Sequence, residues 1–436
     1  MFEKTFCSSP WFHARLTYDG SFEPCRWAKN PVRSNSFQNQ SLMQYYNSDQ
    51  MKLFRTQLLN GEKPDYCSTC YYEESFGKIN GRIRQLNKSA IDVNNFNLTI
   101  RSSPHYKNFE YSLNNNGQAN MAPVDLQIEL GNTCNSACIM CVPEASSRLE
   151  QEYHKLNKIN PSLFVKPKTY KSWTKDENLV KKFVQEIISI PKLRYIHFLG
   201  GETLYDESFY TICDQLVAHG IAKDIIVGTT TNGTIFNNRI QKFIENFKQF
   251  HLGISIESVT PLNDYVRWPG KIDNILPNID KFLQLREDNP GLFISLRITP
   301  NVFSIYDIDK LFVYMIENHV IAESCNILHN PQHLRMELMP DDIRNEVKDK
   351  LEKLIEYYEL KKESIANIRR KDKIDQVTAN VVLDYYQFVS NYNVPDEVEN
   401  LRRNLIDFIK SFESLRGNSI LDYVPRYEKF LRNYGY

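Results

Sequence analysis

The sequence has no run of about 18 uncharged apolar residues, the length that a membrane-spanning helix requires. Its first residues, MFEKTFCSSPW, also lack the basic start and apolar core of a secretory signal peptide. We therefore expect a cytoplasmic protein that does not bind a membrane.

The chain has no excess of either charge, since Lys+Arg and Asp+Glu both number 53. This balance excludes a uniformly basic surface, and there is no clear signal of nucleic-acid binding. No repeat of about 20–50 residues is present, which excludes a solenoid. The remaining composition, 42% hydrophobic and 24% charged, is ordinary, and 436 residues suffice for two or three domains.

Cysteine is uncommon and unevenly placed, because only Cys213 and Cys325 of the nine lie outside the first third of the chain. An odd number of cysteines without an export signal does not suit a disulfide framework. Clustered thiols in a reducing compartment instead indicate ligation of a metal ion or an iron–sulfur cluster. We expect Cys213, which shares a helix with Phe209 and Ile212, to be core, and His197 to be a hydrogen-bonded core histidine.

From residue 124 onwards, short apolar runs alternate with amphipathic helical patterns, which predicts parallel strands covered by helices. The fold class is therefore α/β, in the form of an open or partial barrel of the TIM type, with its active site in the loops after the strands. We expect five strands and a weaker sixth, at 124–130, 195–199, 224–229, 251–257, 292–298 and 325–328.

Helices are predicted between these strands. A capping box of Thr174 and Glu177 opens the first. The second ends before Gly220, at the left-handed position that favours glycine. The third should be broken or kinked at Pro277. The third and fourth helices are expected at about 272–287 and 308–318.

The composition changes along the chain and predicts four segments. Residues 1–110 contain four cysteines and look loop-rich, as in a small module that a metal or cluster stabilises. Residues 111–123, rich in Asn and Gly, are typical of a linker. Residues 124–334 contain the barrel, and 335–436 form a helical extension.

The strongest signal is the loop after the first strand, where Cys134, Cys138 and Cys141 follow a C-x3-C-x2-C spacing. Three thiolates can hold three irons of a [4Fe–4S] cube, so that the fourth iron can bind a small molecule. The simpler alternative is a zinc knuckle without its fourth ligand. The position of the loop, directly after the first strand of an α/β pattern, favours the cluster.

Glycines and polar residues follow the next strands. A Gly-Gly-Glu sequence ends the second strand, where glycines would let a ligand approach the backbone and the carboxylate suits an ammonium group. An asparagine follows the third strand. A serine on the fourth could hold a ribose, and an arginine after it could hold a carboxylate. Each is also compatible with an ordinary turn or loop, but together they indicate a site. They are Gly200, Gly201, Glu202, Asn232, Ser255 and Arg267.

The cysteine loop, the Gly-Gly-Glu sequence and the Ser-Ile-Glu sequence at 255–257 resemble the radical S-adenosylmethionine superfamily, over about residues 124–334. The resemblance implies a partial (β/α)6 barrel in which Cys134, Cys138 and Cys141 ligate a [4Fe–4S] cluster. S-adenosylmethionine would bind the open iron. Reductive cleavage would then give a 5′-deoxyadenosyl radical that abstracts a hydrogen atom from a substrate.

The same resemblance implies the contacts to S-adenosylmethionine. Gly201 and Glu202 would meet the amine, Ser255 the ribose and Arg267 the carboxylate. Two positions depart from the pattern. The residue before the third cysteine is methionine where many members have an aromatic residue, and residue 257 is glutamate where relatives often have aspartate.

The four N-terminal cysteines form a second group. Asp19-Gly20 is typical of a β-hairpin turn between two of them. The segment resembles the SPASM or twitch modules that hold auxiliary clusters, although those modules usually follow the barrel. The resemblance favours a second [4Fe–4S] cluster, with zinc or unligated thiols as alternatives. The candidate ligands are Cys7, Cys25, Cys67 and Cys70.

The sequence leaves the substrate open. A peptide is favoured, because relatives with auxiliary clusters often modify peptides, and a nucleoside, sugar or small metabolite is the alternative. A reductant such as flavodoxin or ferredoxin is the expected partner. The rival interpretation is a non-enzymatic zinc or electron-transfer protein that binds a partner.

Overall fold

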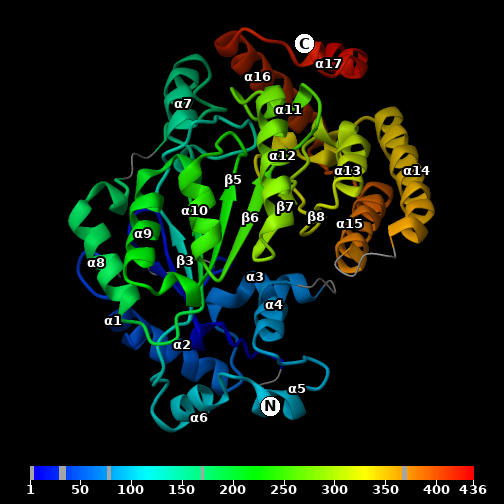
Figure 1. Ribbon diagram of the computed structural model, residues 1–436. Coiled ribbons are helices and arrows are strands. Elements are labelled where there is room, and N and C mark those ends of the chain that lie inside the picture. The colour runs from blue at the N-terminus through cyan, green and yellow to red at the C-terminus, as the bar shows by residue number, and fades with distance from the viewer. Residues whose placement is uncertain (1–3, 29–35, 76–79, 168–170, 366–370) are drawn as a thin grey trace.

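The computed structural model describes residues 4–28, 36–75, 80–167, 171–365 and 371–436. Its centre is one sheet in which the described strands follow the spatial order β2-β1-β3-β4-β5-β6-β7-β8 (Figure 1). All neighbours are parallel except β2, which pairs antiparallel with β1. The strands are β1 (His13–Leu16), β2 (Phe22–Glu23), β3 (Asp125–Glu129), β4 (Tyr195–Leu199), β5 (Ile226–Thr231), β6 (Gln249–Ser255), β7 (Leu292–Arg297) and β8 (Ile321–Ala322).

Helices connect the six parallel strands from β3 to β8, so the predicted α/β fold with a partial (β/α)6 barrel is confirmed. The helices pack on the outer face of the sheet. Phe198 of β4, for example, meets Phe209 of α9 edge to face at 5.3 Å. These helices are α7 (Ser147–Ile159), α8 (Glu177–Ile188), α9 (Glu207–Ala218), α10 (Asn238–Asn246), α11 (Leu262–Val266), α12 (Ile272–Asp288) and α13 (Ile308–Glu317).

The inner face of the sheet is polar. Side chains alternate along each strand, so the residues between the buried apolar ones point away from the covering helices. Here, the "inner face" means this set of side chains. It comprises Arg15, Gln127, Glu129, His197, Gly228, Thr230, Gly253, Ser255, Ser295 and Arg297, which the strand registers place in neighbouring rows.

From residue 42 onwards the described N-terminal region is largely helical, so the expectation that residues 1–110 are loop-rich was wrong for that part, whereas the described residues before it hold only a short hairpin, one 3-10 turn and loops. Its helices are short, which hides their periodicity, and they are stabilised by mutual packing of large side chains such as Trp11, Tyr45 and Phe54. They are α1 (Leu42–Tyr46), α2 (Asp49–Leu59), α3 (Ser68–Glu74), α4 (Gly81–Lys88), α5 (Phe96–Thr99) and α6 (Tyr106–Asn114). Helix α6 reaches into the predicted linker.

The predicted hairpin is present, with Gly20 at φ +83° in its turn. Its first strand, β1, adds to the barrel sheet beside β3. Arg15 of β1 forms ion pairs with Glu23 of β2 and Glu129 of β3. The cysteine-rich segment and the barrel therefore share one sheet, and the proposed division at 110–124 stays a prediction about the sequence.

Most element boundaries agree with the predictions, and the exceptions have physical reasons. Helix α8 is capped by Asp176 rather than by Thr174, because the Thr174 hydroxyl donates to the carbonyl of Leu130. Helix α12 continues through Pro277, held by buried Ile275 and Ile279 on either side. The expected strand at 325–328 is not formed, and β8 lies four residues earlier.

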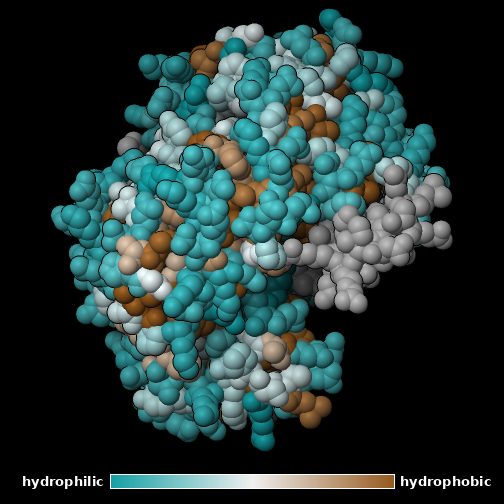
Figure 2. All heavy atoms as spheres, viewed as in Figure 1, coloured by the Kyte–Doolittle hydropathy of each residue, from teal (hydrophilic) through white to brown (hydrophobic). Residues whose placement is uncertain are grey.

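The C-terminal extension is helical, as predicted, with α14 (Asp341–Ile365), α15 (Lys371–Asn391), α16 (Val398–Arg416) and α17 (Glu428–Asn433). Figure 1 shows α16 and α17 at the end of the molecule opposite the N-terminal helices. Figure 2 shows a mainly hydrophilic surface with scattered hydrophobic groups. Within the described part of the chain, no helix combines the length and apolar character needed to cross a membrane.

Candidate active site

The loop with Cys134, Cys138 and Cys141, residues 130–146, connects β3 to α7 and is held by backbone contacts. The amides of Ala137 and Ile139 donate to the carbonyls of Trp268 and Val266, at 2.6 and 2.9 Å. Ser146 caps α7 and donates to the carbonyl of Ser136 at 2.6 Å. We call this segment the cysteine loop.

Gly200 and Gly201 follow β4 at positive φ, +94° and +50°. A Cβ on either residue would lie closer than 3.0 Å to a carbonyl oxygen of the cysteine loop, that of Gly131 or of Thr133. The glycines are therefore required for the approach of the cysteine loop itself, whereas the sequence suggested the approach of a ligand. The amide of Glu202 then donates to Thr133 at 2.9 Å.

A cavity of about 210 Å³ lies where these loops meet. All nine site residues predicted for the barrel line it, together with residues that were not singled out, among them Ser136, Ser146 and Thr231. The predicted residues are Cys134, Cys138, Cys141, Gly200, Gly201, Glu202, Asn232, Ser255 and Arg267. We call this space the loop cavity.

Glu202 is the buried carboxylate of the loop cavity. It accepts hydrogen bonds from the Thr231 hydroxyl at 2.6 Å and from the amides of Asn232 and Leu204, at 2.5 and 3.1 Å. Burial raises its pKa to about 7, and the three donors oppose that shift. The Asn232 side chain in turn donates to Ser136 at 2.8 Å, which ties the end of β5 to the cysteine loop.

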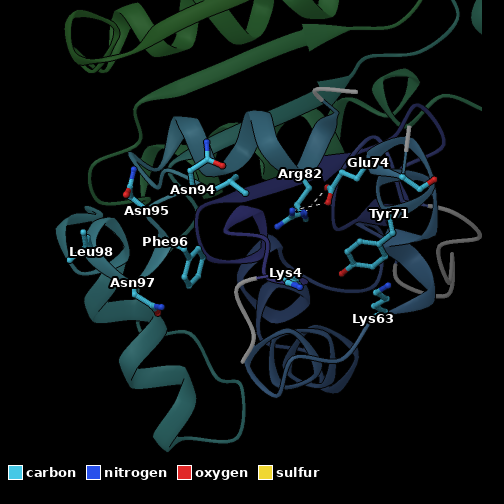
Figure 3. Close-up of a pocket in the computed structure, with 12 residues that line it drawn as sticks. Lys4, Lys63, Tyr71, Glu74, Arg82, Asn94, Asn95, Phe96, Asn97 and Leu98 are labelled. Atoms are coloured by element: carbon cyan, nitrogen blue, oxygen red, sulfur yellow. Dashed lines mark hydrogen bonds and ion pairs between the residues drawn. The ribbon is translucent and has the colours of Figure 1, made fainter. Parts of the chain in front are cut away.

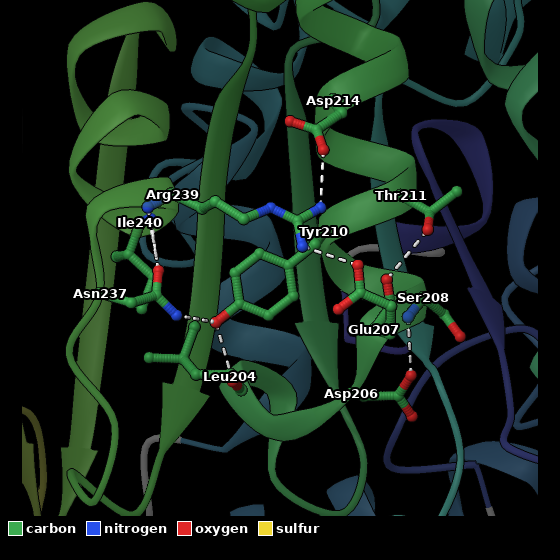
Figure 4. Close-up of polar contacts among 10 residues, drawn as sticks. All are labelled: Leu204, Asp206, Glu207, Ser208, Tyr210, Thr211, Asp214, Asn237, Arg239 and Ile240. Carbon is green, nitrogen blue, oxygen red and sulfur yellow. Dashed lines mark hydrogen bonds and ion pairs between the residues drawn. The ribbon is translucent and has the colours of Figure 1, made fainter.

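A polar network outside the sheet fixes the segment after Glu202 (Figure 4). The Tyr210 hydroxyl donates to the carbonyl of Leu204 at 2.8 Å and accepts from Asn237 at 2.9 Å. Arg239 lies over the Tyr210 ring at 4.4 Å and pairs with two acidic residues of α9. The network joins α9 and α10 and leaves the Leu204 amide aimed at Glu202.

Arg267 also lines the loop cavity. Its guanidinium forms an ion pair of 2.7 Å with buried Glu257 and lies 3.8 Å from the sulfur of Cys138. Its Nε is buried without a hydrogen-bond partner. Burial raises the pKa of Glu257, and the Arg267 charge opposes this. Glu257, which stands where relatives often have aspartate, is thus the ion-pair partner of Arg267.

Sequence reasoning missed Arg416, at the end of α16. Its guanidinium donates to the carbonyl of Ala137 and pairs with Glu152 of α7, both at 2.6 Å. Its side chain is only 2% exposed and lies over the Phe412 ring at 4.2 Å. No local pattern could have identified it, because 279 positions separate it from Ala137.

The four N-terminal cysteines line a second cavity with Trp27, Phe54, Tyr66 and Arg82, so the fold brings this predicted ligand set together. We call this space the N-terminal cysteine cavity. Burial raises the pKa of Cys25 to about 11 and that of Cys67 to about 12. All nine cysteines of the chain are free thiols, and Cys213 is fully buried as predicted. Among the described residues, no three His, Cys, Asp or Glu side chains converge as they would on one metal ion.

A wider cavity of about 750 Å³ opens beside these cysteines (Figure 3). Tyr71 and Arg82 line it on one side, and Asn94, Asn95 and Phe96 on the other. Arg82 pairs with Glu74 at 2.6 Å and donates to the carbonyl of Phe6, beside Cys7. This wider cavity therefore lies next to the N-terminal cysteine cavity, because Arg82 lines both.

His197 differs from its prediction. It lies on the inner face, and its Nε2 is buried without a hydrogen-bond partner, so it is not a satisfied core histidine. Burial lowers its pKa to about 3, and the charges of Arg297 and Arg26 add to the shift. The ring is therefore neutral at physiological pH.

Two family models match the chain. The radical SAM superfamily model covers residues 128–296, and the SPASM model of an iron–sulfur cluster-binding domain covers residues 7–71. No curated protein matches. Among solved structures, native anSMEcpe with bound AdoMet has 14% identity and a TM-score of 0.37 over 55% of this chain and 62% of that one. Streptococcus suis SuiB bound to precursor peptide SuiA has 12% identity and a TM-score of 0.34 over 72% and 61%. This chain thus spans less than two thirds of the length of either structure.

Proposed function

We propose, from the match of residues 128–296 to the radical SAM superfamily and of residues 7–71 to the SPASM domain, that the chain is a radical S-adenosylmethionine enzyme. It would reductively cleave S-adenosylmethionine and use the 5′-deoxyadenosyl radical to abstract hydrogen from a substrate. One observation carries the proposal. The three cysteines of the loop line a single cavity with the glycines, carboxylate, amide, hydroxyl and guanidinium expected around S-adenosylmethionine.

The residues of the loop cavity fit a [4Fe–4S] cluster with S-adenosylmethionine. Cys134, Cys138 and Cys141 would hold three irons. When bound, such a cluster would supply the electron for reductive cleavage of the carbon–sulfur bond. Glu202 would hold the methionyl amine, and Arg267, restrained by its ion pair, would hold the carboxylate.

The hydrogen bonds that Glu202 accepts explain how its carboxylate can bind a cation. Three donors point at its carboxylate, so the ionised form persists near neutral pH despite burial. An ammonium beside it would lower its pKa further. Ser255, at the end of β6, would supply the hydroxyl that binds the ribose.

Cys7, Cys25, Cys67 and Cys70 would hold a second, auxiliary [4Fe–4S] cluster. Support comes from their common cavity and from burial, which suits a group that must be shielded from water. We favour a peptide substrate, by resemblance to SPASM proteins, and a reductant such as flavodoxin or ferredoxin. Free thiols and these clusters also favour the reducing cytoplasm.

The test is the iron and sulfide content of anaerobically reconstituted protein, with 5′-deoxyadenosine measured under dithionite. We expect about eight irons in the native chain, and about four in a Cys134→Ala/Cys138→Ala/Cys141→Ala variant that makes no deoxyadenosine. About four irons in the native chain and none in the variant would make the N-terminal group a zinc or thiol site. A native chain without iron or deoxyadenosine would instead support the non-enzymatic zinc protein.

A further inference from the structure

Three uncharged polar side chains gather on the inner face of the sheet without hydrogen-bond partners. They belong to Gln127 of β3 and to Tyr195 and His197 of β4. Gln127 is only 7% exposed, yet its carboxamide makes no hydrogen bond to a described residue. The Nε2 atom of His197 is buried without a partner, and the Tyr195 hydroxyl has none within the described part of the chain. We call these three side chains the inner-face cluster.

The geometry of the sheet places these side chains together. Gln127 and His197 are direct partners in the register of β3 and β4, and neighbouring strands lie about 5 Å apart. The rings of Tyr195 and His197 have centroids 6.0 Å apart. Gly228 of β5 leaves room for both rings, since a Cβ there would collide with the Tyr195 hydroxyl and lie 3.4 Å from the His197 ring. The inner-face cluster therefore extends over three adjacent strands.

The inner-face cluster lies next to the loop cavity. Leu199 lines that cavity and follows His197 by two residues, on the same face of β4. Thr230 lines it too, two residues after Gly228 on β5. Two residues of a strand span about 7 Å. A substrate that extends from the loop cavity along the inner face would therefore reach the inner-face cluster.

The inner-face cluster offers a ligand hydrogen bonds but no charge. The His197 ring is neutral, because burial lowers its pKa to about 3. The cations that the strand register and ring contacts place beside the cluster, Arg15 and Lys88, both form ion pairs with carboxylates. A buried anion or cation would lack a counter-charge here, whereas an uncharged group with a donor and an acceptor would not.

We propose that the inner-face cluster is a substrate-binding subsite for an amide group, in which Gln127 pairs with the N–H and the C=O of the substrate. The proposal rests on the proposed function and names the class of substrate that the loop cavity would act on. A carboxamide carries a donor and an acceptor side by side, so it matches an amide edge to edge. Tyr195 and His197 would form the remaining hydrogen bonds. Because buried polar atoms are costly when unpaired, such a subsite discriminates against ligands without an amide.

An amide of this kind can come from two sources with the same chemistry. A peptide presents the N–H and C=O of its backbone, and a nucleobase such as uracil presents the same pair on its ring edge. A sugar has hydroxyl groups but no amide, so it would not pair with both atoms of the Gln127 carboxamide. The subsite therefore favours a peptide or a nucleoside over a sugar.

The test measures the binding of acetyl-triglycine amide, uridine and glucose to the reconstituted holoenzyme with S-adenosylmethionine present, by titration calorimetry. The native chain should bind the peptide or the nucleoside saturably, and glucose at least tenfold more weakly. Gln127→Leu removes the carboxamide at similar volume and should weaken binding of the preferred amide probe at least tenfold. Gln151→Leu, the same change at an exposed position of α7, should stay within about threefold of the native chain.

Tyr195→Phe is the second variant, because loss of one hydroxyl leaves the ring packing intact. It should keep the native iron content and weaken binding of the same probe about fivefold. The subsite is overturned if the native chain binds neither amide probe saturably, if glucose binds as tightly, or if Gln127→Leu binds the probe as the native chain does. Should Gln127→Leu lose its iron, unchanged binding by Tyr195→Phe overturns it instead. Failure of the proposed function has a different signature, the absence of deoxyadenosine from the native holoenzyme.

Discussion

At the scale of single residues, the loop cavity depends on glycines that let two backbone segments approach closely as much as on the cysteines that would ligate the cluster. Gly201 combines a positive φ with a carbonyl of the cysteine loop directly in the path of any Cβ. Its neighbour Glu202 is fixed by two donors at the end of β5 and by one from the turn that follows Glu202 itself. A side chain at Gly201 would therefore move the cysteines and the carboxylate together.

We predict that Gly201→Ala lowers both the iron bound in the loop cavity and deoxyadenosine formation, by tenfold or more. Gly220→Ala is the matched control, because Gly220 also has positive φ, +72°, but has nothing within 4 Å of a Cβ. The control should cost only about 1 kcal/mol of unfolding free energy, measured in urea, with normal iron content. Equal iron loss in both variants would attribute the effect to strain alone.

Gly253→Ala tests the space that Arg297 occupies above β6. The added methyl group should displace Arg297 from Thr230 and so disturb the inner face without touching a cysteine. We expect normal iron content and about tenfold lower deoxyadenosine formation, because Thr230 lines the loop cavity. Unchanged deoxyadenosine formation would show that the position of Arg297 does not affect the loop cavity.

At the scale of elements, the C-terminal helix α16 completes the cysteine loop. Arg416 donates to the loop carbonyl next to Cys138 and also pairs with α7. It places a positive charge near thiolates that would carry a cluster. The charge of Arg416 accordingly lowers the pKa of Cys138, against the larger effect of burial and alongside Arg267.

We predict that Arg416→Gln lowers the reduction potential of the loop cluster and reduces deoxyadenosine formation by about tenfold, because a positive charge near the thiolates and the hydrogen bond to the Ala137 carbonyl are both lost. The potential is read by EPR during a dithionite titration. Arg403→Gln, on the same helix, should leave both values unchanged. A potential that stays the same in Arg416→Gln would leave the residue only a packing role.

Asp125 connects three elements at the other end of the sheet. It lies on β3, bonds His13 of β1 at 2.9 Å and pairs with Lys88 of α4 at 3.2 Å. Burial acts to raise its pKa, but the His13 bond, the charge of His13 and the Lys88 pair outweigh it and hold the value at about 2. Since the folded pKa lies below the unfolded value, the stabilisation is present above about pH 4 and is lost as the pH falls towards 2.

We predict that Asp125→Asn lowers the free energy of unfolding by about 2 kcal/mol at pH 7, and by progressively less between pH 4 and pH 2. Urea unfolding at several pH values gives the measurement. Asp396→Asn, at an exposed site, is the control and should change stability by less than about 0.5 kcal/mol. If the destabilisation by Asp125→Asn did not decrease between pH 4 and pH 2, the ion pairs of Asp125 with His13 and Lys88 would not be its cause.

At the scale of the whole molecule, the N-terminal segment is built into the barrel sheet. Strand β1 covers the edge of β3, and Arg15 and His13 pair with Glu129 and Asp125 across that edge. A chain that begins at residue 124 would expose this edge and leave two carboxylates without partners.

We predict that residues 124–436 alone aggregate or fail to fold, as seen by size-exclusion chromatography and circular dichroism. The full chain, purified in the same way, is the control. A monomeric, folded fragment that binds about four irons would show that the two segments are independent domains.

The sequence by itself determined the barrel and its motif residues, because strand–helix alternation and C-x3-C-x2-C spacing are local patterns. Gly200, Gly201, Glu202, Asn232 and Arg267 follow successive strands, and parallel strands bring such residues to one edge. That is why the lining of the loop cavity could be predicted.

Only the tertiary structure decided the rest. The pairing of β1 with β3 and the bond from Arg416 to the cysteine loop join residues more than 100 positions apart, where no local period operates. The short N-terminal helices were missed because packing, rather than propensity, stabilises them.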